Sequence, residues 1–196
     1  MRRIFDVFIS SFVLLLGFPF CIIIALIIFL FDFGAPFFYQ YRVGQYGKQF
    51  KLIKLRTMSI NKFDFQGSFD VGNNSRVTKI GKFLRKIKAD EFPQFLNVLK
   101  GDMSIVGPRP EVKYWVNVYP ERWAIVHQMK PGITDNASIE FRNEEEILAK
   151  SQNPKETYQT EILPRKLELY EEYIRDHSIM KDINIIIRTI YIILTT

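Results

Sequence analysis

The sequence predicts a mixed α/β, helix-dominated membrane protein, with an N-terminal membrane helix broken by a proline and a small β-hairpin. Three observations predict this class. Residues 7–31 carry no formal charge, residues 36–58 alternate as strands do, and later segments have helical spacing. We therefore expect a membrane helix over residues 1–35 and a cytoplasmic, membrane-associated domain over residues 36–196.

Composition excludes several classes of function. The chain has 196 residues, a net charge of +6 and 47% hydrophobic residues, which suffices for a core and excludes a disordered chain. One cysteine, Cys21, and two histidines exclude an internal disulfide and a His/Cys zinc site. A pI near 9.3 is the only feature in favour of nucleic-acid binding, and we expect no nucleic-acid partner.

The N-terminal segment has the length of a membrane helix. Its 25 uncharged residues would form a helix of about 37 Å, enough to cross a hydrocarbon core of about 30 Å. Gly17 and Pro19 predict a bend near Phe18. Two shapes remain open: a kinked helix that spans the membrane, or a re-entrant helix that returns to the same face. Basic residues on both sides favour the second.

The next segment is typical of a hairpin. Residues 36–58 begin with aromatic residues and contain the turn sequence VGQYG. Alternation in the second strand places Lys54 and Arg56 on one face, where charged side chains without further context are simply solvated. Residues 59–77 contain glycines and asparagines with no sustained period, and predict a loop.

A basic amphipathic helix follows, with Thr78 as its N-cap. Its apolar side has helical spacing from Ile80 to Ile87. Its polar side is entirely basic, comprising Lys79, Lys82, Arg85, Lys86 and Lys88. Such a helix suits a membrane surface or a phosphate-bearing ligand, and otherwise presents a solvated face.

A second short helix is expected from Phe92 to Lys100, with Gly101 at its end. Asp90 is its natural N-cap, and capping alone would account for an aspartate here. Arg109 lies between two prolines that stiffen the backbone. Because cations and a helix N-terminus surround Asp90, we expect its carboxylate to stay ionised.

The C-terminal part reads as mainly helical. Residues 114–129 are irregular to helical, and Glu144–Glu146 are typical acids of a helix N-terminus. A helix is expected from Pro164 to about Asp176. Residues 183–194 are too few to span a bilayer, which predicts a buried or interfacial helix.

These features converge on phosphate chemistry. Arginine binds phosphate in a bidentate manner and lysine supplies a point charge. An ionised carboxylate beside them can attack phosphorus or bind Mg²⁺ that neutralises a diphosphate. Asp90, followed by Glu91, is the candidate for either role.

Residues 78–110 closely resemble the signature of bacterial sugar transferases, the small monotopic phosphoglycosyl transferases. KLRTM at residues 54–58, KPGIT at residues 130–134 and the C-terminal YIRDHSIMKDINIIIRTI occur in the order of that family. The resemblance implies transfer of a sugar 1-phosphate from a UDP-sugar to polyprenyl (undecaprenyl) phosphate, with release of UMP and with Mg²⁺. It also implies a re-entrant helix and a place on the cytoplasmic face of the bacterial inner membrane.

The resemblance assigns roles to particular residues. Asp90 is the expected nucleophile of a ping-pong reaction and a Mg²⁺ ligand, and Glu91 is its catalytic neighbour. Lys54, Arg85 and Arg109 are expected to bind phosphate or nucleotide. Two further candidates for substrate binding are Arg56, on the strand face, and Arg142, which keeps its place in the family pattern.

One segment departs from the family. After KPGIT many members have Gly-Trp-Ala-Gln-Val, where this chain has DNASI at residues 135–139. The identity of the sugar is therefore open, as is the oligomeric state. We expect the chain to be the minimal catalytic unit. The alternative is a non-catalytic peripheral membrane protein that binds anionic lipid through residues 79–88.

Overall fold

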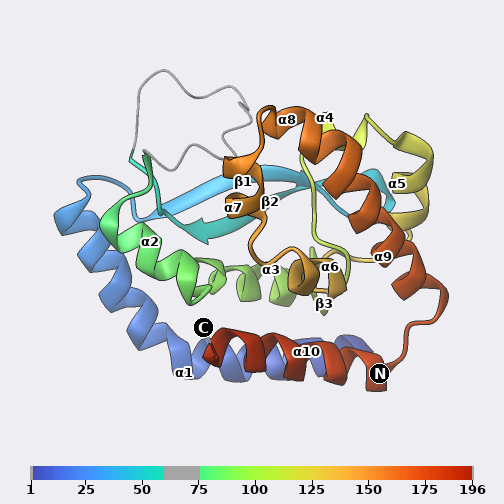
Figure 1. Cartoon of the computed structure of the whole chain (residues 1–196). Helices are drawn as coiled ribbons and strands as arrows, with labels where there is room; N and C mark the ends of the chain where they lie inside the picture. The colour runs from blue at the N-terminus through green and yellow to red at the C-terminus, as the bar shows by residue number, and fades with distance from the viewer. Residues whose placement is uncertain (1, 60–75, 196) are drawn as a thin grey trace.

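The computed structural model describes residues 2–59 and 76–195. Helices predominate over two small sheets (Figure 1). The elements, in chain order, are α1 (Arg2–Phe31), β1 (Phe37–Val43), η1 (Gln45–Gly47), β2 (Gln49–Leu55), α2 (Lys79–Lys86), η3 (Ala89–Glu91), α3 (Gln94–Lys100), β3 (Ser104–Val106), α4 (Lys113–Val116), α5 (Pro120–Val126), β4 (Gly132–Thr134), α6 (Asn136–Glu140), α7 (Glu144–Lys150), α8 (Pro154–Thr157), η4 (Tyr158–Ile162), α9 (Leu163–Arg175) and α10 (Ile179–Leu194).

Helix α1 is long and apolar enough to cross a membrane, and few of its residues are buried. It runs along the lower edge of the molecule and then changes direction to rise at the left, which agrees with the expected bend (Figure 1). The expected break is wrong in one respect: the helix continues through Pro19. A proline removes only its own N–H and displaces one carbonyl, so the neighbouring helical bonds persist.

The predicted hairpin is confirmed. Strands β1 and β2 pair antiparallel, with Phe37 opposite Leu55 and Lys54 opposite Phe38. The outer edge of β2 is covered by the buried Asn97 of α3. Its Oδ1 accepts from the N–H of Ile53 at 3.2 Å, and its Nδ2 donates to the carbonyl of Lys51 at 2.8 Å. Asn97 thereby takes the place of a third strand.

The structure confirms the cap of α2 and corrects that of α3. Thr78 Oγ1 accepts from the N–H of Gly81 at 2.9 Å, as predicted. Helix α3, however, begins at Gln94, its N-cap is Pro93, and Asp90 does not cap it. The reason is the left-handed Lys88, with φ of +57°, which turns the chain into the separate 3₁₀ turn η3. Gly101, with φ of +94°, ends α3 as predicted.

The remaining elements partly match expectation. Helix α9 confirms the predicted helix from Pro164, and a π-helical turn, η4, precedes it. Helix α10 begins at Ile179, four residues earlier than predicted, because Ser178 caps it. The parallel pair of β3 with β4 was not predicted. Most of the predicted loop of residues 59–77 lies outside the described residues.

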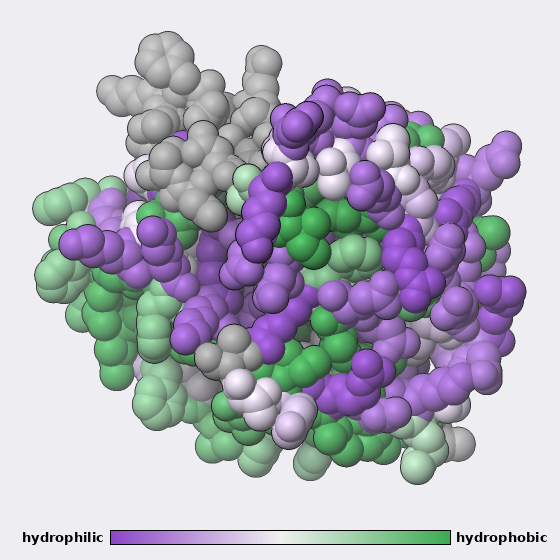
Figure 2. All heavy atoms as spheres, in the orientation of Figure 1, coloured by the Kyte–Doolittle hydropathy of each residue, from purple (hydrophilic) through white to green (hydrophobic). Residues whose placement is uncertain are grey.

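Hydrophobic residues form the cores and one outer edge. One core gathers under α5 and α9, including Trp123 and Leu167, and another joins β2 to α3 and β3. Large apolar side chains of α1 and α10 remain exposed. They gather along the lower and left edges of the molecule, while hydrophilic residues cover the upper right (Figure 2).

Candidate active site

The candidate site lies on η3, where the chain turns between α2 and α3. Asp90 and Glu91 are adjacent and both buried, at 6% and 7% exposure. Leading into α3, Phe92 packs against α1 at Gly17, where a Cβ would lie 2.2 Å from its ring. The apolar N-terminal helix therefore touches the segment that carries the two carboxylates.

Glu91 is held by two cations. Arg109 binds it in a bidentate manner, with Nη2 to Oε1 at 2.5 Å and Nη1 to Oε2 at 3.2 Å, and Lys54 Nζ lies 3.1 Å from Oε1. Burial acts to raise the pKa of Glu91, but Arg109 and Lys54 outweigh it, so this pKa lies well below its usual range. Glu91 is thus an ionised anchor for both cations.

Asp90 has the opposite environment. Its buried Oδ1 has no hydrogen-bond partner within the part of the chain that the structure describes. Burial raises the pKa of Asp90, although Lys54 opposes the shift. The expectation of an ionised Asp90 considered only the surrounding cations, and burial in fact works against ionisation. A carboxylate with an unbonded oxygen in this position is free to bond to something else.

The structure brings Lys54 and Arg109 together at the dyad. Lys54 extends from β2, and burial lowers the pKa of its ammonium group while Glu91 opposes the shift. Arg109 comes from the segment after β3. Glu91 raises the pKa of the Arg109 guanidinium, so this group stays charged.

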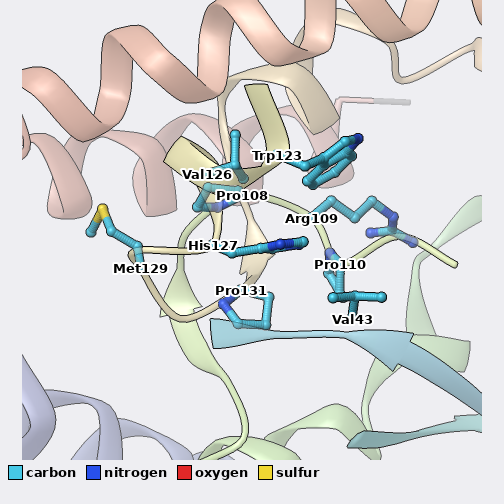
Figure 3. A pocket seen from close by; sticks show the side chains of 9 residues that line it. All are labelled: Val43, Pro108, Arg109, Pro110, Trp123, Val126, His127, Met129 and Pro131. Carbon is cyan, nitrogen blue, oxygen red and sulfur yellow. The ribbon is translucent and has the colours of Figure 1, made fainter. Parts of the chain in front are cut away.

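The backbone around Arg109 is rigid. Pro108 and Pro110 lie beside it, and its guanidinium extends away from the ring of His127 (Figure 3). Behind it is a cavity of about 10 Å³, which also contacts Trp123 and Pro131 and has room for about one water molecule. This cavity is far too small for a nucleotide.

Arg85 lies on α2, one turn before the dyad, and makes a different set of contacts. Its Nε donates to Thr57 Oγ1 at 3.0 Å, and its Nη1 lies 2.8 Å from Glu145 Oε1 on α7. One guanidinium thus links α2 to α7 and to the segment just after β2. Arg85 does not contact Glu91 directly, as Lys54 and Arg109 do.

The other two candidates lie apart from these contacts. Arg56 is buried, and its Nη2 donates to the carbonyls of Asp32 at 3.1 Å and Gly34 at 3.5 Å, just beyond α1. Arg142 is half-buried in the turn after α6. Neither residue is brought into contact with the dyad within residues 2–59 and 76–195, so their roles in binding stay predictions.

A model of the family "Bacterial sugar transferase" matches residues 1–196. The chain belongs to the bacterial sugar transferase family. The "UDP-glucose:undecaprenyl-phosphate glucose-1-phosphate transferase" of Escherichia coli (strain K12) is 37% identical over 97% of this chain and 39% of that protein. The protein of the same name from Caulobacter vibrioides is 33% identical over 100% of this chain and 70% of its own length.

Relatives differ in the sugar that their names give. The "UDP-N-acetylgalactosamine-undecaprenyl-phosphate N-acetylgalactosaminephosphotransferase" of Aeromonas hydrophila is 30% identical over 100% of this chain and 44% of that protein. The chain spans about two fifths of the length of the first relatives it matches.

Sequence reasoning missed several residues around the candidate site. Thr57 lies inside KLRTM, but nothing in the sequence indicates that it binds Arg85. Glu145 was predicted only as a helix N-terminal acid, a position that α7 confirms without revealing its bond to Arg85. Asp135, in the departing DNASI segment, is the buried N-cap of α6 and accepts from Ser138 N–H at 2.9 Å. A short polar run after a turn is the kind of signal that predicts such a cap.

A second, partly buried cluster lies at the other end of the hairpin. Glu111 binds Arg42 at 2.5 Å and accepts from the Tyr158 hydroxyl at 2.6 Å. Burial acts to raise the pKa of Glu111, but Arg42 and the Tyr158 hydroxyl outweigh it and lower this pKa. The cluster fixes β1 against η4, next to the segment of Arg109, and has no sequence signal because its members are far apart in the chain.

Proposed function

We propose that this chain transfers a sugar 1-phosphate from a UDP-sugar to polyprenyl phosphate and releases UMP. The observation that carries the proposal is the contrast between the two carboxylates: Glu91 is fully engaged by cations, whereas the buried Asp90 Oδ1 has no partner among the described residues. Family membership and the names of the relatives support the same reaction class.

The first step is attack by Asp90 on the β-phosphorus of the donor. An O–P bond forms between the carboxylate and phosphorus, and the bond from this phosphorus to the bridging oxygen breaks. That oxygen leaves with UMP, and the sugar phosphate stays on Asp90 as an acyl phosphate. Lys54 and Arg109 form ion pairs with Glu91, the residue next to Asp90. From there they can neutralise charge on the phosphate oxygens.

The second step regenerates the enzyme. A phosphate oxygen of the polyprenyl acceptor attacks the same phosphorus, and the bond to Asp90 breaks, which restores the carboxylate. One cationic site then serves both anionic substrates in turn, which is the logic of a ping-pong reaction. The product is a polyprenyl diphosphate sugar, the expected starting lipid of bacterial glycoconjugate assembly.

The site fits a Mg²⁺ ion that is held partly by the protein and partly by the substrate. No group of three or more His, Cys, Asp or Glu side chains within the described ranges forms a protein cage. Mg²⁺ characteristically binds one or two carboxylates and completes its shell with water and substrate phosphates. The Asp90 carboxylate, with two oxygens of which Oδ1 has no partner among the described residues, would supply such a ligand. When bound, the ion would neutralise charge on the diphosphate of the donor.

The experiment is single-turnover release of UMP. Wild-type protein with UDP-sugar and no acceptor should release at most one UMP per chain and retain the labelled sugar phosphate. Asp90→Asn should release none, whereas Glu121→Gln, an equal charge change on exposed α5, should behave as wild type. Full activity in Asp90→Asn, or no UMP without acceptor, would contradict the covalent step.

We further propose that α1 is re-entrant, at the cytoplasmic face of the inner membrane. Both of its ends are bonded to the same folded body. Arg3 donates to the carbonyls of Val98 and Leu99 at the end of α3, and Arg56 donates to the carbonyl of Asp32 beyond the other end of α1. A helix that crossed the bilayer would place these ends on opposite sides. The exposed apolar edge would then face lipid (Figure 2).

Cysteine labelling tests this topology. In a Cys21→Ser background, Ile4→Cys and Phe33→Cys place thiols at exposed positions near the two ends. An impermeant maleimide should label neither position in intact cells and both after lysis. Labelling of either position from outside would support a spanning helix instead.

Lipid binding without catalysis is the second candidate. The observation in its favour is the exposure of Lys79, Lys82 and Lys86 on α2, a surface suited to anionic headgroups. It predicts salt-sensitive binding to anionic vesicles and no turnover of any nucleotide sugar. Release of UMP by wild-type protein would exclude it as the whole function.

A further inference from the structure

The guanidinium of Arg85 is only partly available to a ligand. A phosphate bound in a bidentate manner needs two adjacent N–H groups on one edge, either Nε with Nη2 or Nη1 with Nη2. Thr57 occupies Nε at 3.0 Å, and Glu145 occupies Nη1 at 2.8 Å. Each edge therefore contains one nitrogen that already donates to the protein, so a bound phosphate competes with one of the two partners.

Glu145 is the easier partner to displace. Thr57 is 7% exposed, its carbonyl accepts from the N–H of Thr78, and its backbone packs directly against Gly81. The Glu145 side chain is 53% exposed, on the first turn of the seven-residue helix α7. Exposed ion pairs contribute about 0.2–1 kcal/mol, so a doubly charged phosphate can compete with this one.

We propose that Glu145 is a positioning residue that acts through Arg85: it holds the guanidinium in place and gives way when a phosphate or diphosphate binds. Its carboxylate competes with the ligand for Nη1 and thereby weakens the affinity of the site. The inference rests on the proposed function only for the identity of the ligand, since any diphosphate has the required chemistry.

The neighbouring acids provide a matched control. Glu144 is engaged by Lys166, but Glu146, one residue on, is exposed and forms no side-chain bond within the described chain. Glu145→Gln and Glu146→Gln remove the same charge from the same helix turn. A difference between them measures direct competition for Arg85 and not the general electrostatic potential.

The test is a calorimetric titration of the full chain, in detergent micelles, with inorganic pyrophosphate, which measures the binding affinity. We expect Glu145→Gln to bind up to about fivefold more tightly than wild type, and Glu146→Gln to change little. In an Arg85→Ala background the gain from Glu145→Gln should disappear. An equal gain in Glu146→Gln, a gain that persists without Arg85, or no gain at all would overturn the proposal.

Turnover gives a separate readout. Glu145→Gln should lower the KM for a UDP-sugar without raising kcat, whereas a loss of structure would lower kcat and the unfolding temperature. If neither wild type nor variant releases UMP, the proposed function fails, and a pyrophosphate affinity that depends on Glu145 and Arg85 still supports this inference.

Discussion

Two neighbouring carboxylates, Asp90 and Glu91, receive opposite environments from the same turn. Burial raises the pKa of one, and paired cations lower that of the other. Such a separation commonly marks two carboxyl groups with different chemical roles. Here it distinguishes a free oxygen that can react from an anchor that fixes Lys54 and Arg109.

The raised pKa of Asp90 has a consequence for the pH dependence of the reaction. The carboxylate must be ionised to attack, so kcat/KM for the UDP-sugar should fall on the acid side. The midpoint of that fall should lie above 3.8, the usual value for aspartate, because burial disfavours the charged form. A pH profile of initial UMP release measures it. A midpoint at or below 3.8 would contradict the assignment.

Glu91→Gln should move that midpoint to lower pH. The ionised Glu91 raises the pKa of Asp90, so its removal favours ionisation of Asp90. At the same time kcat should fall about 100-fold, because Lys54 and Arg109 lose the group that positions them. Glu121→Gln is the control for charge, and should leave the profile in place. A midpoint that moves upward would refute the electrostatic coupling.

At this scale the sequence predicted the grouping of Lys54, Glu91 and Arg109 through resemblance and not through spacing. It could not predict that Arg56 bonds to carbonyls beyond α1, because strand alternation fixes the face of a side chain but not its partner. It also could not reveal that Lys88 is left-handed, the feature that separates Asp90 from the cap of α3.

At the scale of elements, local chemistry was sufficient for α2, for the C-terminal end of α3 and for the hairpin. The Thr78 cap, the terminal Gly101 and the glycine-containing turn act over a few residues, and each appears in the structure. The parallel pairing of β3 with β4 joins residues that are 28 positions apart in the chain. Each strand has only three residues, which is too few to show a periodicity.

Gly81 in α2 shows where packing overrides helix propensity. Alanine at an exposed helix position would stabilise by about 1 kcal/mol. A Cβ on Gly81, however, would lie 2.1 Å from the carbonyl oxygen of Thr57. We expect Gly81→Ala to reduce the free energy of unfolding by about 1–3 kcal/mol and to raise the KM, since Thr57 also holds Arg85.

Chemical denaturation in detergent and steady-state kinetics measure these two effects of Gly81→Ala. Lys82→Ala, at the next and exposed position, should stay within about 0.5 kcal/mol of wild type. Stabilisation by Gly81→Ala would show that the α2 backbone can move away from Thr57 at little cost.

At the scale of the whole molecule, the first helix is bound to the body by polar contacts. The buried Asp6 accepts from Ser104 Oγ at 2.9 Å and from the N–H of Ile105 at 3.1 Å, which ties α1 to β3. Arg2 extends the connection to α10 through Asp182. Arg2 and Arg3, which are basic residues on the N-terminal side of the uncharged run, therefore also dock the apolar helix against the domain with the dyad.

The pair of Arg2 with Asp182 joins the first helix to the last, and its loss should loosen both. Arg2 Nε lies 3.1 Å from the buried Asp182, and its Nη2 donates to the carbonyl of Val106 at 2.7 Å. Arg2→Met leaves a buried carboxylate without its cation, which should cost about 2–3 kcal/mol and lower Tm by roughly 4–12 °C. Asp182→Asn in the same background should recover part of that loss, since the unpaired charge is then gone.

Thermal unfolding of the two single variants and the double variant in one detergent measures the coupling. Strictly additive effects would mean that the two helices are docked independently, and that α10 contributes nothing to the placement of α1 beneath the active site.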